Sequence, residues 1–282
     1  MRRPSMLWLK IALTIAAAYV IVVALMAALQ GRLIFPTYIA NAQAPLLPPD
    51  ARRLALTPAG GERLAGTHLP PLAGAKPEAG RGDGGTLILG FGGNATDAGV
   101  VALMLRDLYP ASHVVAFHYR GYGESAGRPS ARALLSDSLA VHDAAVAAIR
   151  PKRVIAIGFS VGAGVAAYLA RHRALAGLVL VTPFDSIEAV ARSHYPWAPV
   201  GLLLRHRMPT VRYLEGRPTP TALIAAGRDR IVPANHTAAL RPAIGNLVLD
   251  RTVPGVGHNG IYGHPAFTAA MTEALAGFPP AP

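Results

Sequence analysis

The 282-residue chain contains no cysteine. Disulfide bonds, cysteine–metal sites and a cysteine nucleophile are therefore excluded together. Acidic residues are also scarce, with 15 Asp and Glu against 27 Lys and Arg, which gives a formal net charge of +12. The basic residues are scattered and no nucleic-acid-binding motif accompanies them, so we expect no nucleic-acid partner. An anionic membrane surface is a better candidate partner for this positive charge than nucleic acid is.

Charged residues make up only 15% of the chain and hydrophobic residues 52%. This balance excludes a disordered chain, which would be poorer in apolar residues and richer in charge. The length suits one large domain with a small appendage. The composition therefore predicts a globular protein that carries an unusually apolar segment.

That apolar segment lies near the N-terminus. Ile11 to Leu29 is an uncharged run of 19 residues, preceded by Arg2, Arg3 and Lys10 and followed by Arg32. As a helix, the run nearly matches a bilayer core of ~30 Å. The positive charge before it predicts a cytoplasmic N-terminus and a domain on the outer or periplasmic side. A cleaved signal peptide, which would release a secreted protein, is the alternative.

The proline-rich stretch after this run predicts a linker. We therefore expect four parts: a basic cytoplasmic N-terminus (1–10), a single-pass transmembrane signal-anchor (11–31), a linker (32–50) and one catalytic domain (51–282).

After residue 85, short apolar runs alternate with stretches whose apolar residues recur at helical spacing. The runs are 86–89, 114–119, 154–157, 178–181, 222–225 and 247–249. Such alternation predicts a parallel sheet with helices on both faces. Residues 52–69, with Gly60-Gly61 between two weaker runs, predict a leading β-hairpin. Sites in folds of this kind form at the carboxyl ends of the strands.

The pattern Gly-x-Ser-x-Gly occurs twice, around Ser125 and around Ser160. A nucleophilic serine in this pattern needs a strand before it and a helix directly after it. Residues 154–157 and 162–170 meet both demands for Ser160. Arg128-Pro129 follows Ser125, and proline disfavours a helix at the preceding residue. Ser160 is therefore the predicted nucleophile, and Ser125 is predicted to lie in a loop near the site.

A serine nucleophile needs a base that accepts its proton and a carboxylate that orients the base. With this motif the chain order is serine, acid, histidine, each after a strand. Asp229 follows the run 222–225, and His258 lies in a glycine-rich loop after the last run. They are the predicted acid and base, with Asp185 as the second candidate for the acid. The histidines lack paired metal-binding spacings, so we expect no metal and no cofactor.

An acyl-transfer site also needs N–H donors for the oxyanion. We expect one from Val161, directly after the nucleophile, and the other from Asn94, with Gly93 as the alternative. Phe91 lies in the same glycine-rich loop, and Tyr195 and Trp197 lie in an apolar stretch before the run 222–225. These three aromatic residues are candidate substrate contacts, and the stretch predicts a small apolar cover over an acyl or lipid-like substrate.

Several motifs together resemble the α/β-hydrolase-domain proteins related to serine aminopeptidase-like hydrolases and membrane-associated acyl-protein thioesterases. The matching stretches are 91–94, 119–127, 158–162, 182–186, 195–199, 226–229 and 257–258. The resemblance implies an α/β-hydrolase fold, with a mostly parallel eight-stranded sheet, and Ser160, Asp229 and His258 as the triad. The family commonly has His-Gly-Asn in the oxyanion loop, where this chain has Gly92-Gly93-Asn94. A side-chain role at position 92 is thereby in doubt, but a backbone donor is not.

The expected function is a serine hydrolase that cleaves carboxylic ester or thioester bonds through an acyl-enzyme. Peptidase or amidase chemistry on the same triad is one alternative. A non-catalytic, membrane-bound hydrolase fold that serves as a binding module is another. Nothing in the sequence indicates an oligomeric state.

Overall fold

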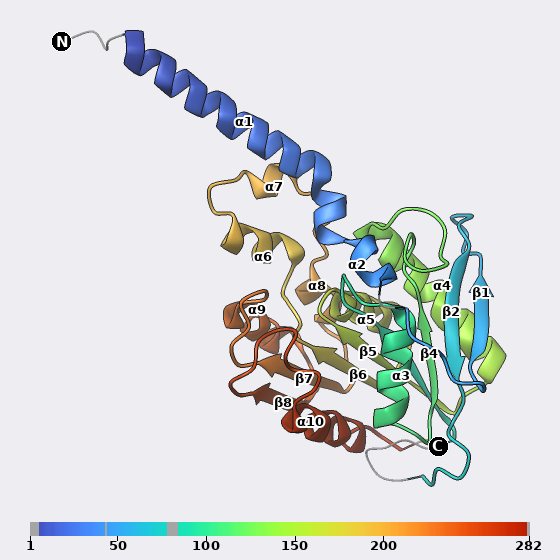
Figure 1. The fold of residues 1–282 in the computed structure, drawn as a ribbon. Coiled ribbons are helices and arrows are strands. Elements are labelled where there is room, and N and C mark those ends of the chain that lie inside the picture. Colours follow the sequence, from blue (N-terminus) through green and yellow to red (C-terminus); the bar gives the residue numbers. More distant parts are fainter. Residues whose placement is uncertain (1–5, 43, 78–83, 281–282) are drawn as a thin grey trace.

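A computed structural model describes residues 6–42, 44–77 and 84–280 (Figure 1). Its strands form one sheet in the order β1-β2-β4-β3-β5-β6-β7-β8, in which β1 and β2 are antiparallel and the other six are parallel. The strands are β1 (Arg52–Leu56), β2 (Leu64–Leu69), β3 (Thr86–Phe91), β4 (His113–Phe117), β5 (Arg153–Phe159), β6 (Gly177–Val181), β7 (Thr221–Ala226) and β8 (Leu247–Val253). The predicted α/β-hydrolase fold with an eight-stranded sheet is confirmed.

Helices cover both faces of this sheet. The helices are α1 (Met6–Ile34), α2 (Thr37–Asn41), α3 (Ala98–Leu108), α4 (Ala131–Ile149), α5 (Val161–His172), α6 (Ile187–His194), α7 (Val200–Leu203), α8 (Thr210–Leu214), α9 (Ala234–Ala238) and α10 (Pro265–Ala276). Helices α3 and α10 pack on one face, and α4, α5 and α8 pack on the other.

Each strand of the parallel sheet contributes to two cores because successive side chains point to opposite faces. In β3, Ile88 packs with α3 and α10, whereas Leu87 and Leu89 pack with α4 and α5. All three side chains are fully buried. Burial on both faces explains why these strands read as continuous apolar runs in the sequence.

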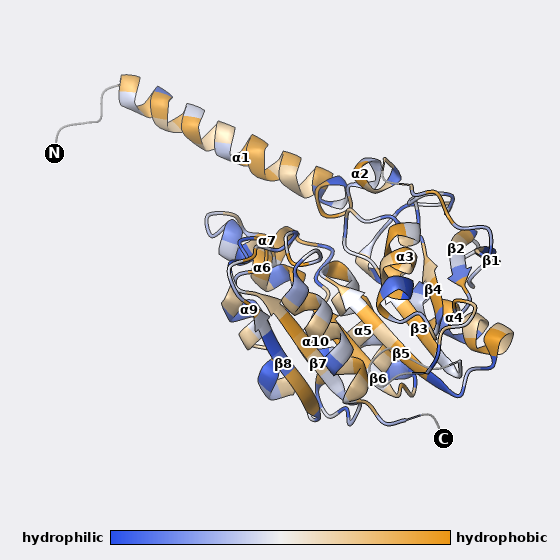
Figure 2. Ribbon diagram, turned by 60° about the horizontal axis from the view of Figure 1, so that its bottom comes forward, coloured by the Kyte–Doolittle hydropathy of each residue, from blue (hydrophilic) through white to orange (hydrophobic). Residues whose placement is uncertain are grey.

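Helix α1 extends away from the domain (Figure 1) and is apolar on nearly all sides (Figure 2). Among the described residues it is the one helix long and apolar enough to cross a membrane. Its N-terminal part is exposed on every side, as expected for a segment that needs lipid around it. The predicted positive charges Arg2 and Arg3 lie outside the described residues.

The predicted linker is packed against the domain along part of its length. Phe35 and Ala40 are buried in the core beside α5, and Ala40 belongs to α2. A linker that only tethers the domain would not bury such residues. The end of α1 is therefore docked on the domain, and the segment 187–204, which holds α6 and α7 and is called the cover segment below, lies next to it.

Tyr109 joins the two helices that cover one face of the sheet. Its side chain is fully buried, and its hydroxyl donates a 2.8 Å hydrogen bond to the carbonyl of Met271 in α10. We expect Tyr109→Phe to lower the free energy of unfolding by ~1 kcal/mol, because a buried hydrogen bond is lost. Chemical denaturation of the full chain in detergent measures this loss. Tyr38→Phe is the control, since the Tyr38 side chain is exposed, and an equal effect of both changes would contradict the prediction.

Candidate active site

Ser160 lies at the junction of β5 and α5 in a strained backbone conformation. Its φ is 52° and its ψ is −115°, a region that residues with a Cβ rarely adopt. Its N–H donates to the carbonyl of Val181 at 2.9 Å, which fixes the turn to the neighbouring strand. Strain of this kind persists only where the surroundings impose it, and it is concentrated at functional sites.

The surroundings that impose the turn are backbone atoms of three elements. A Cβ on Gly158 would overlap the backbone of Gly162, and a Cβ on Gly162 would overlap the carbonyl of Phe91 at the end of β3. Only glycine fits at both positions. The two glycines of the motif thus allow β3, β5 and α5 to meet closely at Ser160.

His258 and Asp229 are paired at the same edge of the sheet. The Nδ1 of His258 lies 2.6 Å from Oδ2 of Asp229, and the two side chains are 6% and 5% exposed. Oδ1 of Asp229 accepts hydrogen bonds from the N–H groups of Ile231 and Val232 at 2.9 and 2.8 Å. The carboxylate is therefore held in one orientation and directs Nε2 of the imidazole away from itself.

The loop that carries His258 packs beside the nucleophile turn. The ring of Tyr262, in that loop, makes an edge contact with Phe159 at a centroid distance of 5.8 Å. Burial, together with the nearby Asp229 carboxylate, raises the pKa of Tyr262 to about 12. In the described part of the chain, no hydrogen bond joins Ser160 to His258. The structure thus pairs the predicted acid and base and places the predicted nucleophile at the edge they share.

The predicted oxyanion loop is held from two sides. A Cβ on Gly93 would lie 3.8 Å from the Cβ of Ser160, so the loop passes directly beside the predicted nucleophile. Tyr119 donates to the carbonyl of Gly92 at 2.8 Å, and Tyr122 donates to the carbonyl of Asn94 at 2.6 Å. The two tyrosines fix the carbonyls of the loop. Sequence reasoning gave these tyrosines no role, because a pattern in sequence does not show which carbonyl a phenol reaches.

The Asn94 side chain has another partner. Its Nδ2 donates to the carbonyl of Ile34, the last residue of α1, at 2.9 Å. This bond holds the Asn94 side chain toward α1, so the predicted oxyanion donors in this loop are the backbone N–H groups of Asn94 and Gly93. Val161 begins α5, and the first N–H groups of a helix have no partner within that helix.

The other predicted residues are spread over the region. Phe91 is buried at the end of β3. Tyr195 lines a pocket against α1, and the carbonyl of Trp197 accepts a hydrogen bond from Tyr19. Ser125 is buried, with its hydroxyl bonded to the backbones of Ala65 and His118 at 2.9 Å each, and is therefore structural. In the ranges described, no three His, Asp or Glu residues are grouped to hold a metal ion.

A second serine–histidine–aspartate arrangement occurs outside the predicted residues. His236 Nδ1 lies 3.0 Å from Asp185 Oδ1, and its Nε2 lies 2.8 Å from the hydroxyl of Ser193 on α6. Asp185 is thus the partner of His236 and not of His258. The sequence gave no signal for this group because no motif marks His236 or Ser193.

Comparisons with known proteins identify the same fold. The sequence model of the family described as "alpha/beta hydrolase fold" matches residues 87–199. An uncharacterized protein of Mycobacterium tuberculosis, Rv2307c, is 35% identical over 82% of this chain and 80% of its own. The chain belongs to the α/β-hydrolase superfamily.

One further relative in sequence and one solved structure of similar fold carry functional names. Lysophosphatidylserine lipase ABHD12 of Danio rerio is 41% identical, over 29% of this chain and 23% of its own. The esterase Pf2001 of Pyrococcus furiosus superposes with a TM-score of 0.63 at 17% identity, over 82% of this chain and 94% of its own. The latter likeness shows the fold alone.

The glycine contacts at the turn lead to a direct test. We expect Gly162→Ala to abolish hydrolysis of any ester that the protein cleaves, and to cost ~1–3 kcal/mol of stability, because the new Cβ forces the loop after β3 away from Ser160. Ester turnover and chemical denaturation measure the two effects. Gly263→Ala is the control, since its Cβ would meet open space. Full activity of Gly162→Ala would refute the close packing.

Proposed function

We propose that this α/β hydrolase is a serine hydrolase that cleaves carboxylic ester or thioester bonds. The observation that carries the proposal is the left-handed backbone conformation of Ser160. This residue lies between the buried strand β5 and the start of α5. The paired His258 and Asp229 at the same sheet edge support it. So does the lipase chemistry in the name of one relative.

In the proposed reaction, Ser160 Oγ attacks the acyl carbonyl while His258 Nε2 removes the hydroxyl proton. His258 then donates that proton to the leaving alcohol or thiol, and an acyl-enzyme remains. Water, deprotonated by His258, attacks the acyl-enzyme, and the proton returns to Ser160 as the acid is released. Asp229 orients the imidazole and stabilises its charged form. The N–H of Val161, with that of Gly93 or Asn94, binds the oxyanion.

Ser193 is the competing nucleophile, since it also contacts a histidine that contacts an aspartate. It lies inside the short helix α6, where helical hydrogen bonding uses the backbone N–H groups that an oxyanion would need. Its backbone is helical and unstrained, and its side chain is exposed to solvent. We therefore assign the chemistry to Ser160 and a structural role to the group around Ser193.

The proposed substrate is an acyl ester or lipid-like molecule reached from a membrane. Helix α1 supports membrane attachment, and the lipase name of one relative supports a lipid ester. By the charge distribution around the apolar run, the N-terminus is cytoplasmic and the domain lies on the outer side. The proposed membrane orientation and substrate class do not depend on which serine is the nucleophile.

Labelling with a fluorophosphonate probe tests the proposal. We expect covalent labelling of the full chain, and its loss in Ser160→Ala, because the probe reacts only with an activated serine. Ser125→Ala and Ser193→Ala are the matched controls and should retain the label. Absence of labelling in the unaltered protein would favour a non-catalytic binding module, and loss of the label only in Ser193→Ala would move the nucleophile to the second group.

A further inference from the structure

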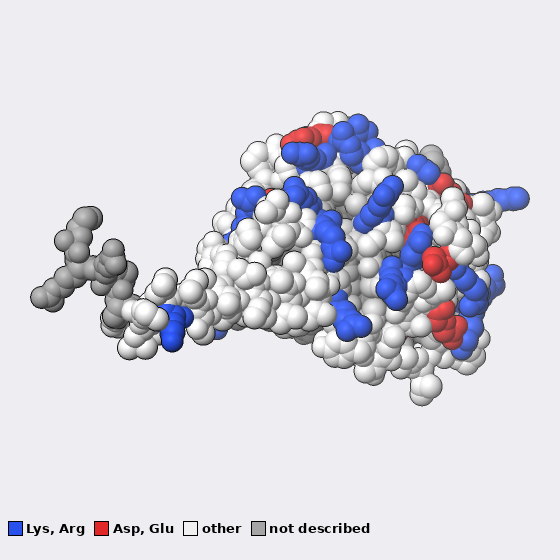
Figure 3. All heavy atoms as spheres, turned by 90° about the horizontal axis from the view of Figure 1, so that it is seen from above, with Lys and Arg blue, Asp and Glu red and all other residues white. Residues whose placement is uncertain are grey.

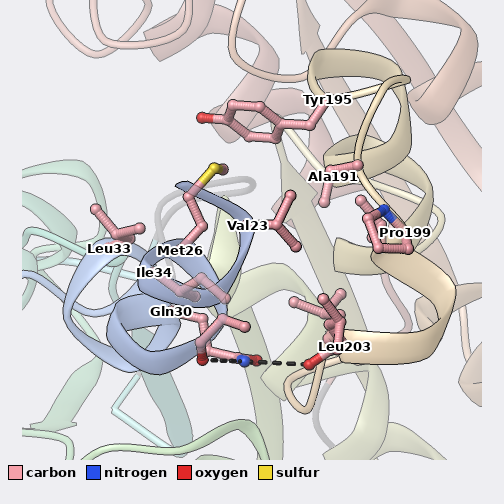
Figure 4. A pocket seen from close by; sticks show the side chains of 13 residues that line it. Val23, Met26, Gln30, Leu33, Ile34, Ala191, Tyr195, Pro199 and Leu203 are labelled. Carbon is pink, nitrogen blue, oxygen red and sulfur yellow. Dashed lines mark hydrogen bonds between the residues drawn. The ribbon is translucent and has the colours of Figure 1, made fainter. Parts of the chain in front are cut away.

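A pocket lies between the membrane helix and the cover segment. Its volume is about 210 Å³, and its walls are predominantly apolar. Figure 4 shows Val23 and Met26 of α1 facing Ala191, Tyr195 and Pro199 of the cover segment across it. Helix α1 therefore forms one wall of a cavity, in addition to its proposed role of attaching the domain to the membrane.

One buried polar residue closes the contact between the two walls. Gln30 is 6% exposed. Its Nε2 donates to the carbonyls of Ala27 and Leu203 at 2.7 and 3.1 Å, and its Oε1 accepts from the N–H of Arg205 at 2.7 Å. Because these bonds occupy the amide, it offers little to a polar ligand. The rest of the pocket lining is predominantly apolar, so the pocket suits an apolar ligand.

The pocket lies where α1 leaves the bilayer core. The helix has 29 residues, or about 43 Å at ~1.5 Å per residue, against a bilayer core of ~30 Å. If the N-terminal part spans the core, the last turns reach the interface. If the first ~20 residues of α1 span the core, the pocket residues from Met26 to Ile34 lie beyond it, and Val23 lies just inside its edge.

The outer surface of the cover segment suits the same position. Trp197 is 48% exposed and Leu202 is 81% exposed, and aromatic residues favour the membrane interface. The face of the domain toward α1 shows more Lys and Arg than Asp and Glu around a broad uncharged area (Figure 3). Both features fit contact with anionic headgroups.

A series of residue contacts links the wall of the pocket to the proposed nucleophile. Ile34 lines the pocket, and its carbonyl accepts the hydrogen bond from Asn94. Asn94 follows Gly93, which lies against Ser160. Ser160 itself does not line the pocket, so an acyl group on the serine must be long for its end to reach the pocket.

We propose that this pocket binds the acyl chain of a membrane-resident ester, which reaches Ser160 past the end of α1. The inference rests on the proposed function. The occupant is one chain and not two, since the volume is below the ~300–1,000 Å³ usual for drug-sized ligands. A lysophospholipid or another single-chain ester meets this requirement. The membrane helix thus contributes to substrate selection.

The test compares long and short substrates on the full chain in lipid nanodiscs. Ala27→Trp fills the pocket, whereas Ala28→Trp, on an exposed position of the same turn, does not. We expect Ala27→Trp to lower kcat/KM for p-nitrophenyl laurate by about tenfold or more, because each methylene in an apolar site is worth about fourfold in affinity. Turnover of p-nitrophenyl acetate should stay within about twofold, and Ala28→Trp should change neither.

A binding measurement keeps the test informative if Ala27→Trp displaces the helix. The probe is a lysophospholipid with a photoreactive diazirine at the end of its chain, bound to Ser160→Ala in nanodiscs. We expect cross-links at Met26 or Leu203, which line the pocket. Cross-links confined to exposed α1 residues such as Leu25 would overturn the proposal, and so would a link between two copies of the chain at the pocket.

The outcomes separate this inference from the proposed function. Cross-links in the pocket without any ester hydrolysis would retain the acyl site and reject the hydrolase. Hydrolysis of both esters, with Ala27→Trp lowering neither, would retain the hydrolase and reject the acyl site. If Ala27→Trp lowers both equally, cross-links outside the pocket reject the acyl site and cross-links inside it retain the site.

Discussion

The contact between Gly162 and the carbonyl of Phe91 is the constraint on which the site depends. It brings the start of α5 against the end of β3 so closely that no side chain fits between them. The backbone of Ser160 must then turn through the left-handed region to pass from β5 into the helix. The same contact brings Gly93 beside Ser160, so one packing restriction positions both the proposed nucleophile and the loop expected to bind the oxyanion.

Much of the fold could be predicted because its signals are local. Each apolar run corresponds to a strand, and the glycine pair at 60–61 marks the turn of the β1–β2 hairpin. The nucleophile and its partners follow from similar reasoning, since a residue after a strand of a parallel sheet lies at the edge that holds the site. Asp229 and His258 were expected on that ground, and the structure pairs them.

What the sequence did not show depends on contacts between distant segments. The hydrogen bond from Asn94 to Ile34 and those of Gln30 to Leu203 and Arg205 join residues far apart in the chain. No periodicity encodes such pairs. For that reason the residues after the anchor read as a linker, although Phe35 packs in the core. The group of Asp185, His236 and Ser193 was missed for the same reason.

These long-range contacts give α1 a role in the domain itself. A tether could be replaced by any apolar helix, whereas α1 uses a buried glutamine, and the carbonyl of its last residue, to contact the cover segment and the oxyanion loop. A polar side chain on an otherwise apolar helix is costly in lipid and is usually retained for a specific partner. The position of α1 and the geometry of the candidate site are therefore coupled.

The most direct measurement is peptide mapping of the acyl-enzyme. The full chain is mixed with p-nitrophenyl acetate, quenched with acid during turnover and digested, and the acetylated peptide is identified by mass spectrometry. The account predicts an acetyl group on Ser160. Acetyl transfer to Ser193, or turnover without any acylated serine, would contradict it.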